Sequence, residues 1–294
     1  MEMSVKKTKM KRPVADIVFD VIKFAIIAFL VIFTLSPILF IVITALSSSA
    51  DAGKLFPDDI DWYSVKWVLT NSDFYTSYGV TIIVVAVGTL LSVLCMSMLG
   101  YALSKKNLPG RKIIFVFFLI AMLFSGGMVP NFVLMNSLGL TDTILSLIFP
   151  NVVNVMNMIL IKNYFEALPE SLEESARMDG AGNFTIFFKI ILPLSIPMII
   201  TISLFTAVAY WNNYTNALLY ISSSASELYP LPYFITQVKA IFNDPNAAVN
   251  LGEAVAYFEN IRAAIIIVSI IPIVILYPFF LKYFTKGVTV GSDK

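Results

Sequence analysis

The stretch LPESLEESARMDGAGNFTIFFKIILP, residues 168–193, is the longest charged interruption between apolar segments in the second half of the chain. Its first part predicts a helix, because Pro169 suits a first helical turn and the glutamates that follow favour the positive N-terminal end of a helix. Three apolar residues fall on one face of this helix, at i, i+4 and i+8: Leu168, Leu172 and Ala176. Gly180 and Gly182 predict a sharp reversal, since glycine accepts left-handed backbone. The stretch is therefore predicted to form a helix–turn–helix hairpin.

The predicted hairpin has an acidic rim. Glu170, Glu173 and Glu174 lie in its first helix, and Glu173 and Arg177 are spaced to pair along the helix surface. An amphipathic loop lying on lipid headgroups is the alternative interpretation. Such interfacial helices normally carry more Lys and Arg on their polar face, and anionic lipid repels acidic side chains. We therefore interpret the hairpin as a docking surface for a partner outside the membrane.

The rest of the chain is strongly apolar, with 58% hydrophobic residues. A membrane-spanning helix needs about 20 apolar residues, and six segments are long enough: residues 24–46, 78–103, 113–135, 143–161, 195–221 and 263–281. None of them contains an ionised side chain, each of which would cost about 2.5–3.5 kcal/mol at a helix centre. We expect an all-α integral membrane domain over residues 24–284, with six transmembrane helices.

Lys and Arg set the predicted orientation, because they are enriched in cytoplasmic segments. The basic N-terminal segment, residues 1–23, is placed inside the cell, as are the hairpin and the C-terminal tail, residues 285–294. The large outer loops are residues 47–77 and 222–262. The first apolar segment is longer than the apolar region of a signal peptide, so we expect it to be retained.

Several kinds of chemistry are excluded by composition. The chain has no histidine and one cysteine, Cys95, so no internal disulfide or zinc site is expected, and no other metal site or catalytic set is predicted. The net charge of +1 gives no indication of nucleic-acid binding. No G-x-x-x-x-G-K-[ST] motif occurs, so the chain is not expected to hydrolyse ATP itself.

Glycines and prolines within the apolar segments predict local features. Kinks are expected at four prolines: Pro37, Pro150, Pro272 and Pro278. Gly88, and the pair Gly126 and Gly127, are interpreted as sites of close helix approach.

The hairpin carries a motif: Glu174-Ser175-Ala176, three residues, Gly180, nine residues, and Ile190-x-Leu192-Pro193. This resembles the EAA loop of ABC importer permeases, with Ser175 in place of the first alanine. Asp179 before the glycine is typical of the carbohydrate branch. The resemblance extends over all six segments. The chain is similar to the second, MalG-like permease of oligosaccharide importers and, more narrowly, to the LplC/YtcP-like polysaccharide group.

The resemblance implies a type I ABC importer permease fold and a transport subunit rather than an enzyme. Residues 165–194 would form the coupling loop on an ATPase dimer that binds ATP and Mg, with no cofactor on this chain. Glu174 would contact the ATPase, Ala176 would allow close approach, and Gly180 would make the turn. A homologous second permease, an extracellular solute-binding lipoprotein and a saccharide cargo complete the expected partners. The implied coupling residues are Glu173, Glu174, Ser175, Ala176, Arg177, Asp179, Gly180, Ile190, Leu192 and Pro193.

Uncharged amides and aromatics within the segments are candidates for the substrate path, because they suit sugar hydroxyls and ring faces: Asn131, Asn154, Asn157, Tyr210, Trp211, Asn212, Asn213 and Asn216. The alternative is hydrogen bonding between helices, worth about 0.6 kcal/mol per contact.

Rival functions are a permease for another polar cargo, such as a peptide or osmolyte, an ion-driven secondary carrier, and a membrane scaffold without cargo. A secondary carrier would usually need intramembrane carboxylates or histidines.

Overall fold

Helices form almost all of the structure. The computed structural model describes residues 14–243 and 252–289. Three continuous helices in this part are long and apolar enough to cross a membrane: α1 (Val14–Ala45), α3 (Ser72–Ser104) and α15 (Phe258–Thr289). They correspond to the first, second and sixth predicted segments. The helix α15 runs through residue 285, where the tail was predicted to begin, and the rest of that tail, from residue 290, lies outside the described residues.

The other three predicted segments are not continuous helices. Residues 113–135 divide into α4 (Arg111–Leu123) and α5 (Met128–Ser137), bent by 115°. Residues 143–161 divide into α6 (Ile144–Ile148) with η2 (Phe149–Asn151), and α7 (Val155–Glu166), bent by 52°. Residues 195–221 divide into α11 (Ile196–Trp211) and α12 (Thr215–Tyr220). A six-segment fold is retained, with a break in three of its segments.

The breaks have local causes. Residues 124–127 separate α4 from α5, and Gly127, the N-cap of α5, adopts φ +89. A Cβ on Gly127 would meet nothing within 4 Å, so the prediction of close helix approach at Gly126 and Gly127 is wrong. In the fourth segment Pro150 lacks a backbone N–H and lies in the 3₁₀ turn η2, as a proline break requires.

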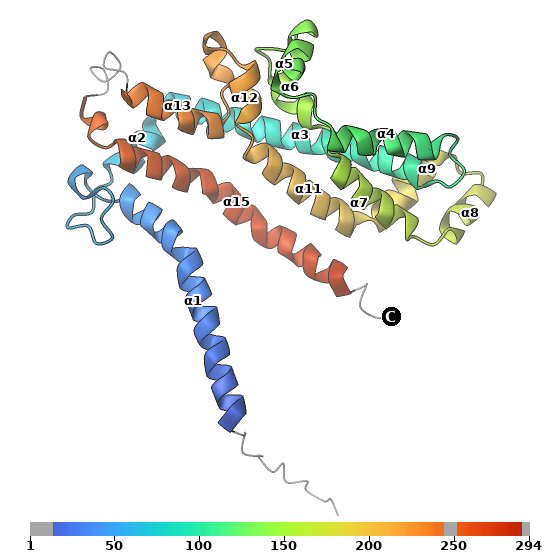
Figure 1. Cartoon of the computed structure of the whole chain (residues 1–294), viewed down its shortest axis with the longest axis horizontal. Helices are drawn as coiled ribbons and strands as arrows, with labels where there is room; N and C mark the ends of the chain where they lie inside the picture. Colours follow the sequence, from blue (N-terminus) through green and yellow to red (C-terminus); the bar gives the residue numbers. More distant parts are fainter. Residues whose placement is uncertain (1–13, 244–251, 290–294) are drawn as a thin grey trace, which may run out of the picture.

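The central helix is α3, which packs against both α7 and α11 (Figure 1). Small residues permit this close packing. A Cβ on Gly88 would lie 2.8 Å from the Tyr210 ring, which confirms close approach at Gly88. A Cβ on Gly100 would lie 3.1 Å from Ile161 Cγ2 and 3.2 Å from the backbone nitrogen of Lys162.

Buried side chains form an outer and an inner cluster at opposite ends of α3, with a third between them. The outer cluster joins α1, α2 (Tyr63–Thr70), α13 (Leu231–Asn243) and α15. The inner cluster joins α3, α7 and the predicted hairpin, which includes α8 (Ser171–Met178). The hairpin and the long outer loops therefore lie at opposite ends of the body (Figure 1).

The predicted outer loops contain short helices: η1 (Ser49–Asp51) and α2 in the first, and η4 (Ser223–Leu228), α13 and η5 (Gly252–Val255) in the second. Asp51 organises the first loop. Its carboxylate accepts hydrogen bonds from the Lys54 ammonium and from the backbone N–H groups of Asp58 and Asp59. The Lys54 ammonium is the largest cause that lowers the Asp51 pKa to about 2.

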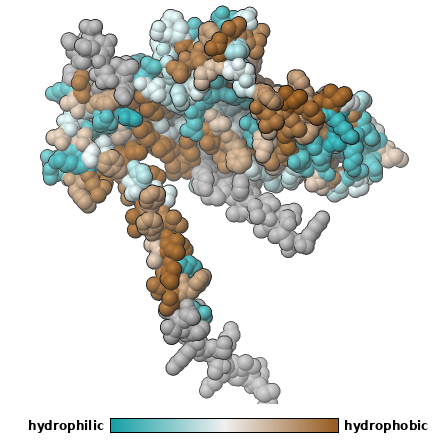
Figure 2. Space-filling view, viewed as in Figure 1, coloured by the Kyte–Doolittle hydropathy of each residue, from teal (hydrophilic) through white to brown (hydrophobic). Residues whose placement is uncertain are grey.

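The helix α1 stands apart from the body, and its apolar side chains are exposed along its length (Figures 1 and 2). Only its outer end is anchored. Asn260 Nδ2 on α15 donates to the carbonyl oxygens of Thr44, at 2.8 Å, and Ser47, at 2.9 Å. The exposed apolar surface of α1 fits lipid or another membrane helix, since hydrocarbon is its low-energy surrounding.

Gly100→Val should destabilise the chain, because the new side chain would force α3 away from α7. Overpacking of this kind costs about 1–3 kcal/mol. Gly79→Val is the matched control, since a Cβ there meets nothing within 4 Å. Thermal unfolding in detergent, followed by tryptophan fluorescence, should show a lower midpoint for Gly100→Val alone. Equal midpoints for the two variants would contradict the close packing of α3 and α7.

Candidate functional site

The hairpin predicted for residues 168–193 is present, and its turn has a defined geometry. Gly180, at φ +81, follows α8. The Gly180 N–H donates to Arg177 O at 3.0 Å, and the Ala181 N–H donates to Ala176 O at 2.9 Å. These two bonds form a Schellman motif, which requires left-handed backbone at the glycine. The hairpin therefore depends on glycine at position 180.

The second arm of the hairpin consists of three pieces. It begins as α9 (Asn183–Ile186), continues as one π-helical turn, η3 (Phe187–Ile191), and ends as α10 (Leu192–Leu194). Leu192 N–H donates to Phe187 O, five residues back. The predicted coupling residues Ile190, Leu192 and Pro193 lie in this irregular part, and an 82° bend follows before α11. Single π-turns of this kind are frequent at functional sites.

The two faces of α8 have different surroundings. Ala176 is buried in the inner cluster, so its small size serves packing within this chain. Glu174 and Ser175 of α8 and its C-cap Asp179 are exposed. Two large apolar side chains also face outward: Met178 is 88% exposed and Phe184 is 71% exposed. The hairpin thus presents a mixed acidic and apolar surface away from the body.

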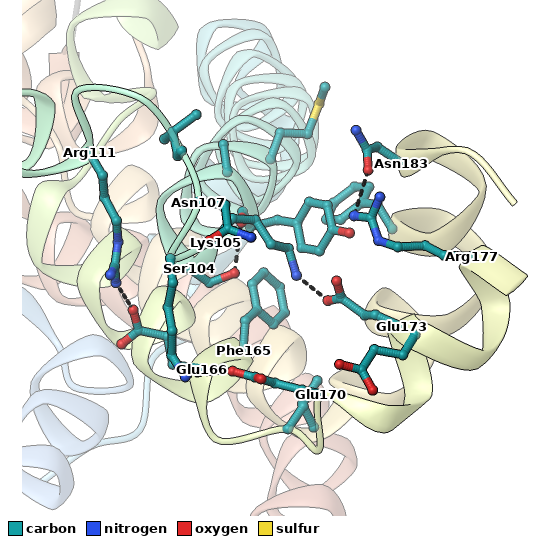
Figure 3. A pocket seen from close by; sticks show the side chains of 18 of the residues that line it. Ser104, Lys105, Asn107, Arg111, Phe165, Glu166, Glu170, Glu173, Arg177 and Asn183 are labelled. Carbon is teal, nitrogen blue, oxygen red and sulfur yellow. Dashed lines mark hydrogen bonds and ion pairs between the residues drawn. The ribbon is translucent and has the colours of Figure 1, made fainter.

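The acidic rim of the hairpin pairs with basic residues of the loop between α3 and α4 (Figure 3). Glu173 pairs with Lys105, and Glu170 accepts from Lys106 at 2.6 Å. The Lys106 ammonium lowers the pKa of Glu170, and Glu170 raises the pKa of Lys106. The predicted pair of Glu173 with Arg177 is not formed, since Arg177 donates to Asn183 Oδ1 at 2.8 Å.

Glu166, the last residue of α7, forms a second set of ion pairs beside these. It pairs with Arg111 at the start of α4 and with the buried Lys162 of α7, at 2.8 Å. We call Lys105, Lys106, Arg111, Lys162 and their glutamate partners the charge network. Between its members lies an open cavity of about 1160 Å³ (Figure 3). Lys and Arg indicated only the orientation of the chain, and the sequence did not predict the pairing of Lys105 and Lys106 with the hairpin.

Amides of the fourth and fifth segments gather around a smaller cavity of about 190 Å³. It is lined at the two breaks by Pro150, Asn151, Val153, Asn154, Asn157, Thr206, Ala209, Tyr210 and Asn213. Asn154 Oδ1 accepts from the Asn157 N–H at 3.0 Å and so caps α7. Thr206 Oγ1 is buried and has no hydrogen-bond partner among the described residues. The cavity is therefore polar and offers unused donors and acceptors.

The other candidate substrate residues, apart from Tyr210, do not line this cavity. Asn131 is exposed on α5, and Trp211 packs edge-on against Tyr78. Asn212 Nδ2 donates to Val208 O of its own helix at 2.9 Å. Asn216 Nδ2 donates to Leu147 O at 3.2 Å, and Tyr210, although it lines the cavity, donates to Ile148 O at 2.9 Å. Of the candidates, Asn154, Asn157 and Asn213 line the cavity with their amides, whereas the side chains of Tyr210, Asn212 and Asn216 donate to backbone carbonyls.

No group of three or more His, Cys, Asp or Glu side chains is placed to hold a metal ion within the residues that the structure describes.

Comparison with known proteins agrees with this arrangement. Residues 96–290 match the family described as binding-protein-dependent transport system inner membrane component. The chain is 39% identical to the polygalacturonan/rhamnogalacturonan transport system permease protein YtcP of Bacillus subtilis (strain 168), over 82% of this chain and 84% of that protein. It is 37% identical to Protein LplC of the same organism, over 94% of this chain and 95% of that protein.

A solved structure is also similar over nearly the whole chain. It is a bacterial ABC transporter involved in the import of the acidic polysaccharide alginate, with a TM-score of 0.84 and 33% identity, covering 94% of this chain and 100% of that one. The predicted resemblance and fold class are confirmed. The chain belongs to the family of binding-protein-dependent transport system inner membrane components, the permease subunits of ABC importers, which are transport subunits and not enzymes.

Proposed function

We propose that this chain forms half of the membrane pore of an importer that takes up oligosaccharides, with ATP and Mg bound by a separate ATPase dimer. The observation that carries the proposal is the hairpin. It is fixed to the inner cluster by Ala176 on one side and exposes an acidic and apolar surface on the other. Such a surface suits a protein partner better than lipid headgroups, which acidic side chains avoid.

The exposed face of the hairpin is the proposed ATPase contact. Glu174 makes no hydrogen bond or ion pair with any residue in the described part of the chain, so its carboxylate is available. Met178 and Phe184 would fill apolar pockets on the partner. Buried apolar anchors with a polar rim are typical of stable protein interfaces.

The charge network would pass motion of the hairpin to the membrane helices. Glu173 links α8 to the end of α3 through Lys105, and Glu166 links α7 to the start of α4 through Arg111. Since α3 packs along both α7 and α11, movement of α8 would shift several helices together. ATP binding would close the ATPase dimer and open the pore outward.

The exposed face of α1 and the outer loops offer surfaces for the remaining partners. A second, homologous permease would supply the other half of the pore and contact the exposed apolar face of α1. A loaded solute-binding protein would dock on the outer loops, at the end of the body opposite the hairpin. This arrangement puts the N- and C-termini in the cytoplasm of a bacterial cell, in agreement with the basic N-terminal segment.

The cargo is proposed to be a fragment of an acidic polysaccharide. Two of the similar proteins are named for polygalacturonan and rhamnogalacturonan, and for alginate. The small polar cavity provides amide donors for hydroxyl and carboxylate oxygens without a buried cation.

Uptake by the reconstituted complex of permeases, ATPase and binding protein tests the proposal. Uptake that depends on an ion gradient and not on ATP would favour the rival secondary carrier, and uptake of peptides or osmolytes would change the cargo.

Gly180→Val should uncouple ATP hydrolysis from uptake, because left-handed backbone costs about 1–2 kcal/mol for a residue with a Cβ and the turn would rearrange. Gly182→Val is the matched control, since Gly182 has φ −75 and open space around it. Uptake per ATP should fall only for Gly180→Val. Wild-type coupling in both variants would remove the hairpin from the mechanism.

Lys105→Glu and Glu173→Lys should each reduce uptake per ATP, and the double exchange should restore it by restoring the ion pair. The Lys106 and Glu170 pair is the control. Both of its side chains are largely exposed, and such surface pairs contribute about 0–1 kcal/mol. Failure of the double exchange to recover transport, with the protein normally assembled, would argue against a coupling role for this pair.

Asn157→Ala should lower oligosaccharide uptake by about tenfold, as expected for a lost hydrogen bond worth about 1–3 kcal/mol. Asn212→Ala is the control, because that amide bonds only within its own helix and lies outside the cavity. The measurement is uptake by proteoliposomes at several cargo concentrations. Equal uptake by both variants would place the cargo path elsewhere.

A further inference from the structure

The breaks of the fourth and fifth segments are joined by two hydrogen bonds. In an uninterrupted helix the Val152 N–H would donate to Ile148 O, but it donates to Phe149 O at 3.3 Å. The Ile148 carbonyl therefore lacks its α-helical donor, and it directly precedes the 3₁₀ turn η2. Tyr210 Oη donates to it at 2.9 Å, and Asn216 Nδ2 donates to the preceding carbonyl, Leu147 O, at 3.2 Å.

The two donors flank the break of the fifth segment. Tyr210 lies in the last turn of α11 and Asn216 in the first turn of α12, with residues 212–214 between the helices. Both side chains are deeply buried, at 3% and 7% exposure. Non-helical backbone at membrane depth is tolerated where its polar groups are satisfied by the protein, and each unsatisfied group costs several kcal/mol. The side chains of one break thus satisfy the backbone of the other.

Tyr210 is also held in place by two residues of α3. Its hydroxyl lies 3.0 Å from Ser92 Oγ on α3, and its ring packs directly on Gly88, where a Cβ would lie 2.8 Å away. Since the hydroxyl proton is donated to Ile148 O, it is not available to a sugar. The cavity-lining groups left for the cargo are the amides of Asn151 and Asn157 and the unpaired hydroxyl of Thr206. Asn154 and Asn213 offer their amide nitrogens, because their Oδ1 atoms accept backbone N–H groups.

We propose that Tyr210 and Asn216 are positioning residues that hold the two breaks as one mechanical unit and thereby set the shape of the polar cavity between them. The inference rests on the proposed transport function. The residue types of Tyr210 and Asn216 suggested contacts with cargo. Their side chains instead donate hydrogen bonds to the backbone carbonyls of Ile148 and Leu147. A change in either break would then alter the cavity, because residues of both breaks line it.

The test compares Tyr210→Phe, Asn216→Leu and the double variant in the full complex with permeases, ATPase and binding protein. Each single variant should lower oligosaccharide uptake by about tenfold, the scale of an unsatisfied buried carbonyl, while ATP hydrolysis continues. Uptake by the double variant should be close to that of the less active single variant, because loss of one hydrogen bond already lets the two breaks move independently. Ser92→Ala is the control. It removes a partner of the Tyr210 hydroxyl and leaves the bond to Ile148 O, so uptake should stay near the wild-type level.

Other outcomes have distinct meanings. Wild-type uptake by Tyr210→Phe, or effects that multiply in the double variant, would overturn the inference. So would a raised half-saturating cargo concentration with an unchanged maximal rate, which would indicate direct contact of Tyr210 with cargo. If Tyr210→Phe fails to assemble, Asn216→Leu and Ser92→Ala decide the question together. Absence of ATP-driven uptake in the wild-type complex would instead contradict the proposed function itself.

Discussion

The constraint on which this structure depends is that backbone N–H and C=O groups in hydrocarbon must find partners inside the protein. Continuous helices such as α3 meet it by themselves. The three broken segments cannot, and each break needs help from elsewhere. At the fourth segment the help comes from Tyr210 and Asn216, which reach the carbonyls of Ile148 and Leu147 from the fifth. The break of the fourth segment therefore lies where side chains of the fifth can reach it, and this requires α3 to offer glycine at position 88 so that the Tyr210 ring can approach.

The same constraint explains why ion pairs lie at the two ends of the body and uncharged hydrogen bonds lie between them. Charged groups occur at the inner and outer ends, where water is available. In the charge network at the inner end one pair links α8 to the end of α3 and another links α4 to α7. Between the ends the polar side chains are uncharged and mostly bonded to backbone. Ion pairs at the inner end can rearrange at small cost because they are partly solvated. Buried hydrogen bonds to carbonyl oxygens are expensive to break. The ion pairs at the inner end can therefore adjust when the hairpin moves, whereas the buried hydrogen bonds keep the membrane helices in a fixed arrangement as they move.

The sequence predicted what depends on local pattern. Apolar length and the absence of charge identified six segments, and the position of Gly180 after an acidic helix identified the hairpin and its turn. It predicted the break at Pro150 but not the bend of the third segment, because Gly126 and Gly127 have the same sequence signal as a close helix contact. It could not predict the pairing of Lys105 with Glu173, which are 68 residues apart. For the amides, type and depth do not distinguish a side chain that contacts cargo from one that supports a carbonyl. Asn157 and Asn216 differ only in what the fold places opposite them.

That ambiguity has a physical origin that also indicates where cargo can bind. A regular helix has no backbone hydrogen bonds to offer, so a sugar crossing the membrane must find side-chain amides, hydroxyls or interrupted backbone. Interruptions occur in this chain at the third, fourth and fifth segments, and the small polar cavity lies where the last two meet. The amides gather there because a break needs them, and a break provides the space because its helices diverge. Support of the backbone and recognition of a polar cargo thus require the same residue types at the same depth. Only the direction of each side chain separates the two roles, as it does for Asn157 beside the cavity and Asn216 against Leu147 O.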